Sequence, residues 1–143
     1  AAELGKQAAI WMPTGTMANI LALRKHCGMN ARVVLQDQSH IYQDEGDALY
    51  DYQLNAVPLA PSRPYFTTHE LEDVLELSVS GRVLNPVGAV SIESPVRRQA
   101  GQIMHWDEMK AVTELCKNEG IPSHLDGARL YMMSAETGIS IKK

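Results

Sequence analysis

Short apolar runs and longer amphipathic stretches alternate along the 143-residue chain. An apolar run of about four to eight residues bounded by turn residues is typical of a buried strand. On this pattern we predict strands at residues 7–12, 32–36, 55–59, 87–92 and 121–125. Pro13 closes the first run, whereas Glu93 and Asp126 directly follow the last two.

Apolar residues spaced three and four apart predict helices between these strands. Residues 17–27 are apolar nearly all round, which indicates a helix packed between layers, and Gly28 follows as a C-cap. A second helix is predicted at 40–50, although Gly46 weakens it. Thr67 and Glu70 have the spacing of a capping box. A helix ending at Gly120 carries an inward stripe, and another is predicted at 130–137; the stripe is Trp106, Met109, Val112, Leu115 and Cys116.

The alternation of helices and strands predicts a layered α/β fold with a mostly parallel sheet. In such folds, ligands bind in the crevice beyond the carboxyl ends of the strands. Polar residues follow four of the predicted strands: Thr14–Thr16, His40, Glu93 and Asp126. We therefore expect these residues to meet at one edge of the sheet.

Composition narrows the class of protein. The length fits one domain, and a net charge of −4 with a pI near 5.7 gives no reason to expect a nucleic-acid partner. Cys27 and Cys116 are expected to be buried, reduced thiols of a cytoplasmic protein. The sequence shows no signal-peptide pattern, no apolar run long enough for a membrane span, and no zinc-like Cys/His spacing.

The residues Thr14, Gly15 and Thr16 lie between a predicted strand and a predicted helix. Free N–H groups at a helix N-terminus bind anions, and a glycine lets a ligand approach the backbone closely. With hydroxyl donors from the two threonines, this segment is a candidate phosphate site. The alternative is a plain helix start with Thr16 as the N-cap. It is not a P-loop, because no Gly-Lys-Ser/Thr ending follows.

Asp126 directly follows the last predicted strand, and Arg129 follows three residues later. A carboxylate at this position needs a partner, because an unpaired buried charge is costly. A protonated pyridine nitrogen would be such a partner. Arg129 could grip a substrate carboxylate through two hydrogen bonds. The alternatives are a helix cap or an Arg129 salt bridge for Asp126, and a solvated position for Arg129.

Two histidines and two glutamates complete the candidate site. His40 and His124 are predicted at ligand-facing positions, where an imidazole can stack on a ring or transfer a proton. Glu45 follows His40 by about one turn, so both could face one pocket from a helix. Glu93, at a strand end, could orient a neighbour. A local hydrogen bond is the alternative for either histidine, and a cap or a salt bridge to the Arg97–Arg98 pair is the alternative for Glu93.

In combination, these residues resemble the threonine aldolase and β-eliminating lyase family, pyridoxal-phosphate enzymes of the aspartate aminotransferase fold. The resemblance covers nearly the whole chain, and its motifs occur in family order. They are Thr14-Gly15-Thr16-Met17-Ala18-Asn19, Ser39-His40-Ile41-Tyr42 with Glu45, Ile92-Glu93, and His124-Leu125-Asp126-Gly127-Ala128-Arg129-Leu130. The resemblance implies that residues 1–143 are part of the large, cofactor-binding domain of a fold-type I pyridoxal-phosphate enzyme.

The resemblance also implies roles. Thr14–Thr16 would hold the cofactor phosphate, His40 would stack on the pyridine ring, and Asp126 would pair with the ring nitrogen. Arg129 would bind the substrate carboxylate. The remaining roles are proton transfer by His40 with Glu45, and support from Glu93 and His124. The implied reaction is retro-aldol cleavage of a β-hydroxy amino acid to glycine and an aldehyde, in a homo-oligomer.

The chain departs from the family pattern in one respect that bears on catalysis. The family's Schiff-base lysine lies in a Ser-Lys-Gly-like context downstream of the aspartate motif, and none of the six lysines here has that context. We therefore expect this central piece of the large domain to be incomplete for catalysis, with Lys142 and Lys143 at a helix end. Ser94-Pro95-Val96 also stands where the family often has Asn-Thr-His.

Three functions remain open on the sequence. The first is a piece of a pyridoxal-phosphate aldolase acting on a β-hydroxy amino acid. The second is a remnant α/β module that binds a ligand or partner without catalysis. The third is a β-eliminating lyase acting on another amino acid. None of them requires a metal, a nucleic acid or a membrane.

Overall fold

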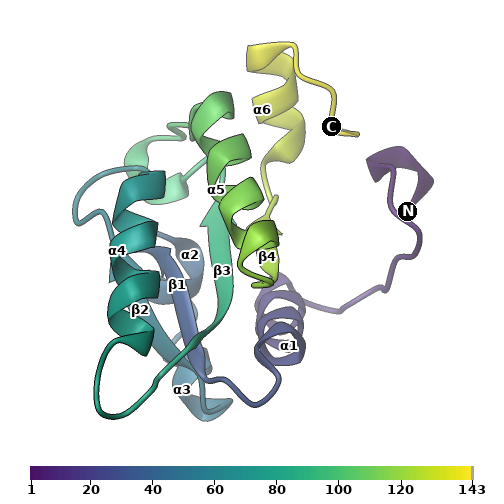
Figure 1. Cartoon of the computed structure of the whole chain (residues 1–143). Helices are drawn as coiled ribbons and strands as arrows, with labels where there is room; N and C mark the ends of the chain where they lie inside the picture. Colours follow the sequence, from purple (N-terminus) through teal and green to yellow (C-terminus); the bar gives the residue numbers. More distant parts are fainter. Residues whose placement is uncertain (143) are drawn as a thin grey trace.

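A computed structural model describes residues 1–142 of the chain. Its centre is a four-stranded sheet in the order β2-β1-β3-β4, and each neighbouring pair of strands is parallel. The strands are β1 (Arg32–Gln36), β2 (Asn55–Leu59), β3 (Val87–Glu93) and β4 (Ser123–Asp126). This is the layered, parallel α/β architecture that the sequence predicts (Figure 1).

Helices cover both faces of the sheet, so two apolar cores form (Figure 1). Val33 and Leu35 of β1 share one core with α1 (Gly15–Cys27), whereas Val34 shares the other with α4 (Thr68–Val79) and α5 (Trp106–Asn118). This alternation follows from the two-residue period of a strand. The remaining elements are α2 (His40–Gln43), α3 (Ala48–Asp51), α6 (Leu130–Thr137) and the 3-10 helices η1 (Ala2–Leu4) and η2 (Arg97–Gln99).

Several local predictions are confirmed. β1, β2 and α6 have the predicted bounds, and β4 begins two residues later than expected. The capping box that opens α4 is formed: the Thr67 hydroxyl accepts the Glu70 N–H, and the Glu70 carboxylate accepts the Thr67 N–H at 2.8 Å. α5 buries Met109, Val112 and Cys116 of the predicted stripe.

The predicted strand at residues 7–12 is wrong. This segment is irregular, and Ile10 and Trp11 are 78% and 84% exposed. It runs along the side of the molecule away from the four strands (Figure 1). A strand needs a neighbour to pair with its backbone groups, and among residues 1–142 no strand pairs with this segment. The apolar character of residues 7–12 does not indicate whether a neighbouring strand is present.

The predicted helix at residues 40–50 is two short helices, α2 and α3, separated by an irregular segment. Gly46 and Asp47 both have positive φ angles, of 60° and 61°, inside the break. A left-handed residue cannot continue a right-handed helix, so the glycine marks an interruption. The consequence is that Glu45 lies between the two helices.

The first helix also differs from its prediction at its start and in its burial. α1 begins at Gly15 with Thr14 as N-cap, two residues before the predicted start, and the Thr14 hydroxyl accepts the Met17 N–H at 3.1 Å. The alternative with Thr16 as N-cap is therefore wrong. α1 buries one face, and Met17 and Leu21 on the other side are exposed, so it is not enclosed between layers in the described chain.

The end of the described chain differs from the predicted helix end. α6 ends at Thr137, and Lys142 follows in a turn; Lys143 lies outside the described residues. Both cysteines are free and buried, as predicted. Of residues 1–142, no helix has the length and apolar character needed to cross a bilayer, and no cluster of three or more His, Cys, Asp or Glu side chains is arranged to hold a metal ion.

Candidate active site

The carboxyl edge of the sheet gathers the predicted site residues, as expected for a parallel sheet. Glu93 and Asp126 are paired neighbours at the ends of β3 and β4. His40 begins α2 shortly after β1, and its backbone N–H donates to the Glu93 carboxylate at 2.6 Å. α1 reaches the same edge through Asn19, which contacts Asp126.

Glu93 holds three segments of this edge together. One carboxylate oxygen accepts the His40 N–H, and the other accepts the Arg97 N–H at 2.9 Å and lies 3.6 Å from the Arg129 guanidinium. Arg97 begins η2, but the N-cap of this helix is Val96, so the predicted alternative of Glu93 as an N-cap is wrong. The predicted salt bridge is not formed, since the side chains of Arg97 and its neighbour pair with Asp44.

Gln36 is a buried site residue that the sequence analysis did not identify. Its Nε2 donates to the Glu93 carbonyl at 2.7 Å and to the Pro64 carbonyl at 3.2 Å, while its Oε1 accepts the Glu93 N–H at 2.8 Å. The amide thus continues the hydrogen bonding between β1 and β3 and fixes the backbone of Glu93. The one available signal was a polar residue at the end of an apolar run.

Asn19 is the second buried residue without a predicted role, although it belongs to the motif at residues 14–19. Its Nδ2 donates to Asp126 Oδ2 and to Glu45 Oε1, both at 3.1 Å. Its Oδ1 lies 3.1 Å from Nε2 of His124. One side chain of α1 therefore connects three predicted site residues.

His40 and Glu45 meet as predicted, but not from one helix. Nε2 of His40 lies 3.6 Å from Oε1 of Glu45, whose side chain is fully buried. Burial raises the pKa of Glu45, and the charge of Asp126 acts in the same direction. The hydrogen bond from Asn19, the nearby His40 and the neighbouring Thr16 side chain act to lower the pKa of Glu45. The other oxygen, Oε2, has no hydrogen-bond partner within residues 1–142.

The predicted phosphate segment forms the start of α1. Among the described residues, no acceptor meets the N–H groups of Gly15 and Thr16. A Cβ atom at Gly15 would meet nothing within 4 Å, so the packing of the chain does not require a glycine there. The helix N-terminus is therefore open to an anion, which the helix dipole favours.

Asp126 and Arg129 do not pair with each other, so the predicted alternative of a salt bridge between them is wrong. Asp126 is 7% exposed, and its Oδ1 accepts the Ala128 N–H at 3.1 Å. No lysine or arginine of residues 1–142 forms an ion pair with it. Arg129 precedes α6 and pairs with Glu93, and its side chain is 31% exposed.

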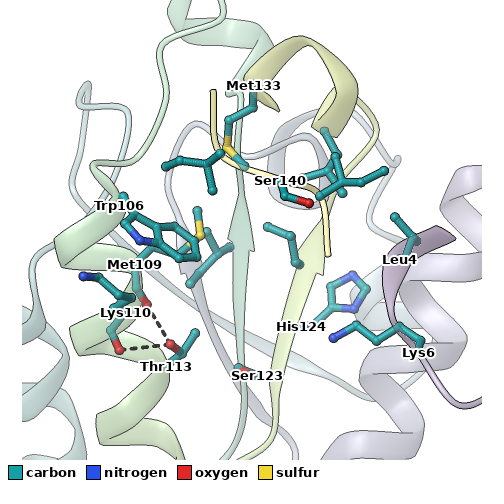
Figure 2. Close-up of a pocket in the computed structure, with 16 residues that line it drawn as sticks. Leu4, Lys6, Trp106, Met109, Lys110, Thr113, Ser123, His124, Met133 and Ser140 are labelled. Atoms are coloured by element: carbon teal, nitrogen blue, oxygen red, sulfur yellow. Dashed lines mark hydrogen bonds between the residues drawn. The ribbon is translucent and has the colours of Figure 1, made fainter. Parts of the chain in front are cut away.

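A cavity of about 630 Å³ lies beside β4, between α5, α6 and the N-terminal segment (Figure 2). Mostly apolar side chains line it, together with His124, Lys6 and Lys110. Asp126, Glu93 and His40 do not line this cavity. His124 therefore contacts both the candidate site and the cavity: its ring lies within hydrogen-bond distance of the Asn19 amide and also lines the cavity.

The family model described as β-eliminating lyase matches residues 1–143. The chain belongs to this family. Curated relatives of this β-eliminating lyase family member include a low-specificity L-threonine aldolase from Candida albicans, 33% identical over 97% of this chain. Another is the low-specificity L-threonine aldolase from Escherichia coli, 26% identical over 100% of this chain. The chain spans 37% of the first and 42% of the second.

Solved structures of the family share the fold. A Listeria monocytogenes protein provisionally named an L-allo-threonine aldolase matches 99% of this chain with a TM-score of 0.85 at 33% identity. The Leishmania major threonine aldolase matches 90% with a TM-score of 0.74 at 20% identity, which supports the fold alone. The chain covers 38% and 37% of these structures. Both structures confirm the predicted fold, that of fold-type I pyridoxal-phosphate enzymes, and the chain covers part of it.

Proposed function

We propose that the protein binds pyridoxal phosphate at the carboxyl edge of the sheet and serves the retro-aldol cleavage of a β-hydroxy amino acid to glycine and an aldehyde. The observation that carries the proposal is a buried carboxylate, Asp126, that is hydrogen-bonded to Asn19 in the second turn of α1, the helix whose N-terminus is open. The names of the relatives support the choice of reaction.

The residues present fit the ring of this cofactor. Each oxygen of Asp126 accepts one hydrogen bond, from Asn19 or Ala128, and a carboxylate can accept about four. A buried carboxylate without a cationic partner is costly. A protonated pyridine nitrogen supplies both the missing positive charge and a further N–H donor. We therefore assign Asp126 to the ring nitrogen.

The residues at the start of α1 fit the phosphate. The N–H groups of Gly15 and Thr16 are open, the missing Cβ of Gly15 leaves room, and the helix dipole favours an anion. The Thr14 hydroxyl accepts a hydrogen bond from Met17 and can still donate its own proton. Thr14, Gly15 and Thr16 are therefore the proposed phosphate contacts.

The other side chains are assigned to the substrate and to proton transfer. When bound, the cofactor supplies an electron sink for the breaking Cα–Cβ bond. His40, about one-third exposed, would stack on the ring, and its Nε2 would take the proton of the substrate hydroxyl group. Glu45, 3.6 Å away, would share that proton. Arg129 would bind the substrate carboxylate with the donors that Glu93 leaves free.

No lysine of residues 1–142 is assigned a covalent role in this proposal. Lys6 and Lys110 line the cavity beside β4, and Lys142 lies in an exposed turn. We propose that this part of the chain provides the non-covalent contacts to phosphate, ring and carboxylate, and that the protein acts as a homo-oligomer.

Calorimetric titration with pyridoxal phosphate tests the proposal. We expect saturable binding at one site and clearly weaker binding of pyridoxal, which lacks the phosphate. Borohydride reduction followed by peptide mapping is the companion measurement, because non-specific adducts would spread over exposed lysines. No saturable binding, or equal binding of the two compounds, would contradict the proposal and favour a module without a cofactor.

A further inference from the structure

Both the nitrogen and the oxygen of the Asn19 side-chain amide contact residues of the candidate site. Asn19 is 8% exposed and lies in the second turn of α1. The two protons of Nδ2 serve Asp126 and Glu45, and Oδ1 faces Nε2 of His124, each at 3.1 Å. An amide has two N–H donors and one oxygen, so both donors and the acceptor are engaged.

The two carboxyl groups determine the orientation of this amide. If Oδ1 faced Asp126 and Glu45, acceptors would oppose an ionised carboxylate. Nδ2 must therefore face them, and Oδ1 must face His124. Burial lowers the pKa of His124, with a smaller contribution from His26, while Asp126 acts to raise it. A neutral imidazole carries one ring N–H, and only a proton on Nε2 can donate to Oδ1.

We propose that Asn19 is a positioning residue that holds the carboxyl groups of Asp126 and Glu45 side by side and fixes His124 as the Nε2–H tautomer. The proposal rests on the proposed function only where it connects Asp126 to the cofactor. A neutral double donor suits this place, because it bridges two acidic groups that would otherwise repel each other. A cation would neutralise the charge that Asp126 offers to a ligand.

This arrangement gives Asn19 two separable effects. On one side it orients Asp126, so its loss should weaken cofactor binding although Asn19 need not touch the cofactor. On the other side it selects the protonated nitrogen of His124 and leaves Nδ1 as an acceptor toward its surroundings. The second effect exists in the protein without any ligand and can be measured there.

Nitrogen-15 NMR of the unliganded protein near neutral pH tests the tautomer directly. We expect His124 to be a single tautomer with its proton on Nε2. In Asn19→Leu the acceptor is gone, and a mixture of the two tautomers should appear. A wild-type His124 protonated on Nδ1 would overturn the proposal, and this result needs no variant to fold. An unchanged single tautomer in Asn19→Leu would overturn it as well.

Cofactor affinity tests the other effect. Asn19→Leu should weaken pyridoxal phosphate binding about tenfold, the loss expected when one hydrogen bond to a charged acceptor is removed. Ser78→Ala is the matched control: it removes a buried hydroxyl on α4 whose hydrogen bond goes to Leu75, and it should leave affinity and tautomer unchanged. Equal affinity of Asn19→Leu and wild type would overturn the positioning of Asp126. If the wild type binds no cofactor, the proposed function fails, while the tautomer still decides the role of Asn19.

Discussion

The guanidinium of Arg129 lies 3.6 Å from the carboxylate of Glu93, which is 2% exposed. A buried carboxylate needs a charged or hydrogen-bonded partner, and Glu93 has three, because it also accepts the N–H groups of His40 and Arg97. The guanidinium has five N–H donors in a rigid plane. Glu93 therefore orients Arg129 at the edge of the sheet and leaves donors free for an anionic ligand.

Replacing Glu93 by glutamine tests this relationship. Glu93→Gln keeps the shape but removes the charge and turns one acceptor into a donor that faces an N–H group. We expect the free energy of unfolding to fall by about 2 kcal/mol, as for a buried hydrogen bond to a charged group. Urea unfolding measures the change, with Glu114→Gln on the exposed side of α5 as control. Equal effects of the two substitutions would show that Glu93 holds nothing in place.

Gly15→Ala should affect cofactor affinity and the stability of the fold in different ways. The new Cβ meets nothing within 4 Å, and alanine favours a helix over glycine by up to about 1 kcal/mol. The variant should therefore be as stable as the wild type or slightly more stable. It should nevertheless bind pyridoxal phosphate about tenfold more weakly, because the Cβ occupies the space offered to the phosphate.

Gly88→Ala is the matched control for that experiment. A Cβ at Gly88 would lie 3.0 Å from atoms of Asn30 and Cys27. Such overpacking should lower the free energy of unfolding by about 1–3 kcal/mol. Thermal unfolding and calorimetric titration measure both variants. Undiminished affinity of Gly15→Ala would show that the phosphate does not bind against Gly15.

His124 should contribute to the pH dependence of the free energy of unfolding. Burial lowers the pKa of His124 in the folded protein below its usual 6.5. As the pH falls below about 6.5, the unfolded chain takes up a proton that the folded chain does not, so the free energy of unfolding decreases. Denaturant unfolding at about pH 7.5 and 5.5 should show this decrease, and it should be smaller in His124→Gln. The same decrease in the wild type and in His124→Gln would contradict the prediction. His69→Gln, which removes an exposed imidazole, is the control and should behave like the wild type.

The sequence predicted the sheet well because its signals are local. The runs at 32–36 and 55–59 are bounded by turn residues, and parallel strands covered on both faces are apolar along their length. The same reasoning failed at 7–12, because a strand also needs a partner, and pairing is not written in the local pattern. The helix predicted at 40–50 failed for a local reason, the left-handed Gly46 and Asp47.

The sequence predicted most of the residues that meet at this edge of the sheet, but not the hydrogen bonds that join them. The meeting of His40, Glu93 and Asp126 follows from the rule that parallel strands present their carboxyl ends at one edge. The hydrogen bonds of Gln36 and Asn19 reach residues up to 107 positions away. No spacing rule contains such contacts, so the two amides that organise the site were found only in the structure.

The assignment of Asp126 to the cofactor has one direct consequence, the protonation of the cofactor's ring nitrogen. Nitrogen-15 NMR with pyridoxal phosphate labelled at that nitrogen reports whether it carries a proton in the wild type and in Asp126→Asn. We predict a protonated nitrogen in the wild type and an unprotonated one in Asp126→Asn, because the amide no longer stabilises the positive charge. The same protonation state in both proteins would contradict the assignment of Asp126 to the ring.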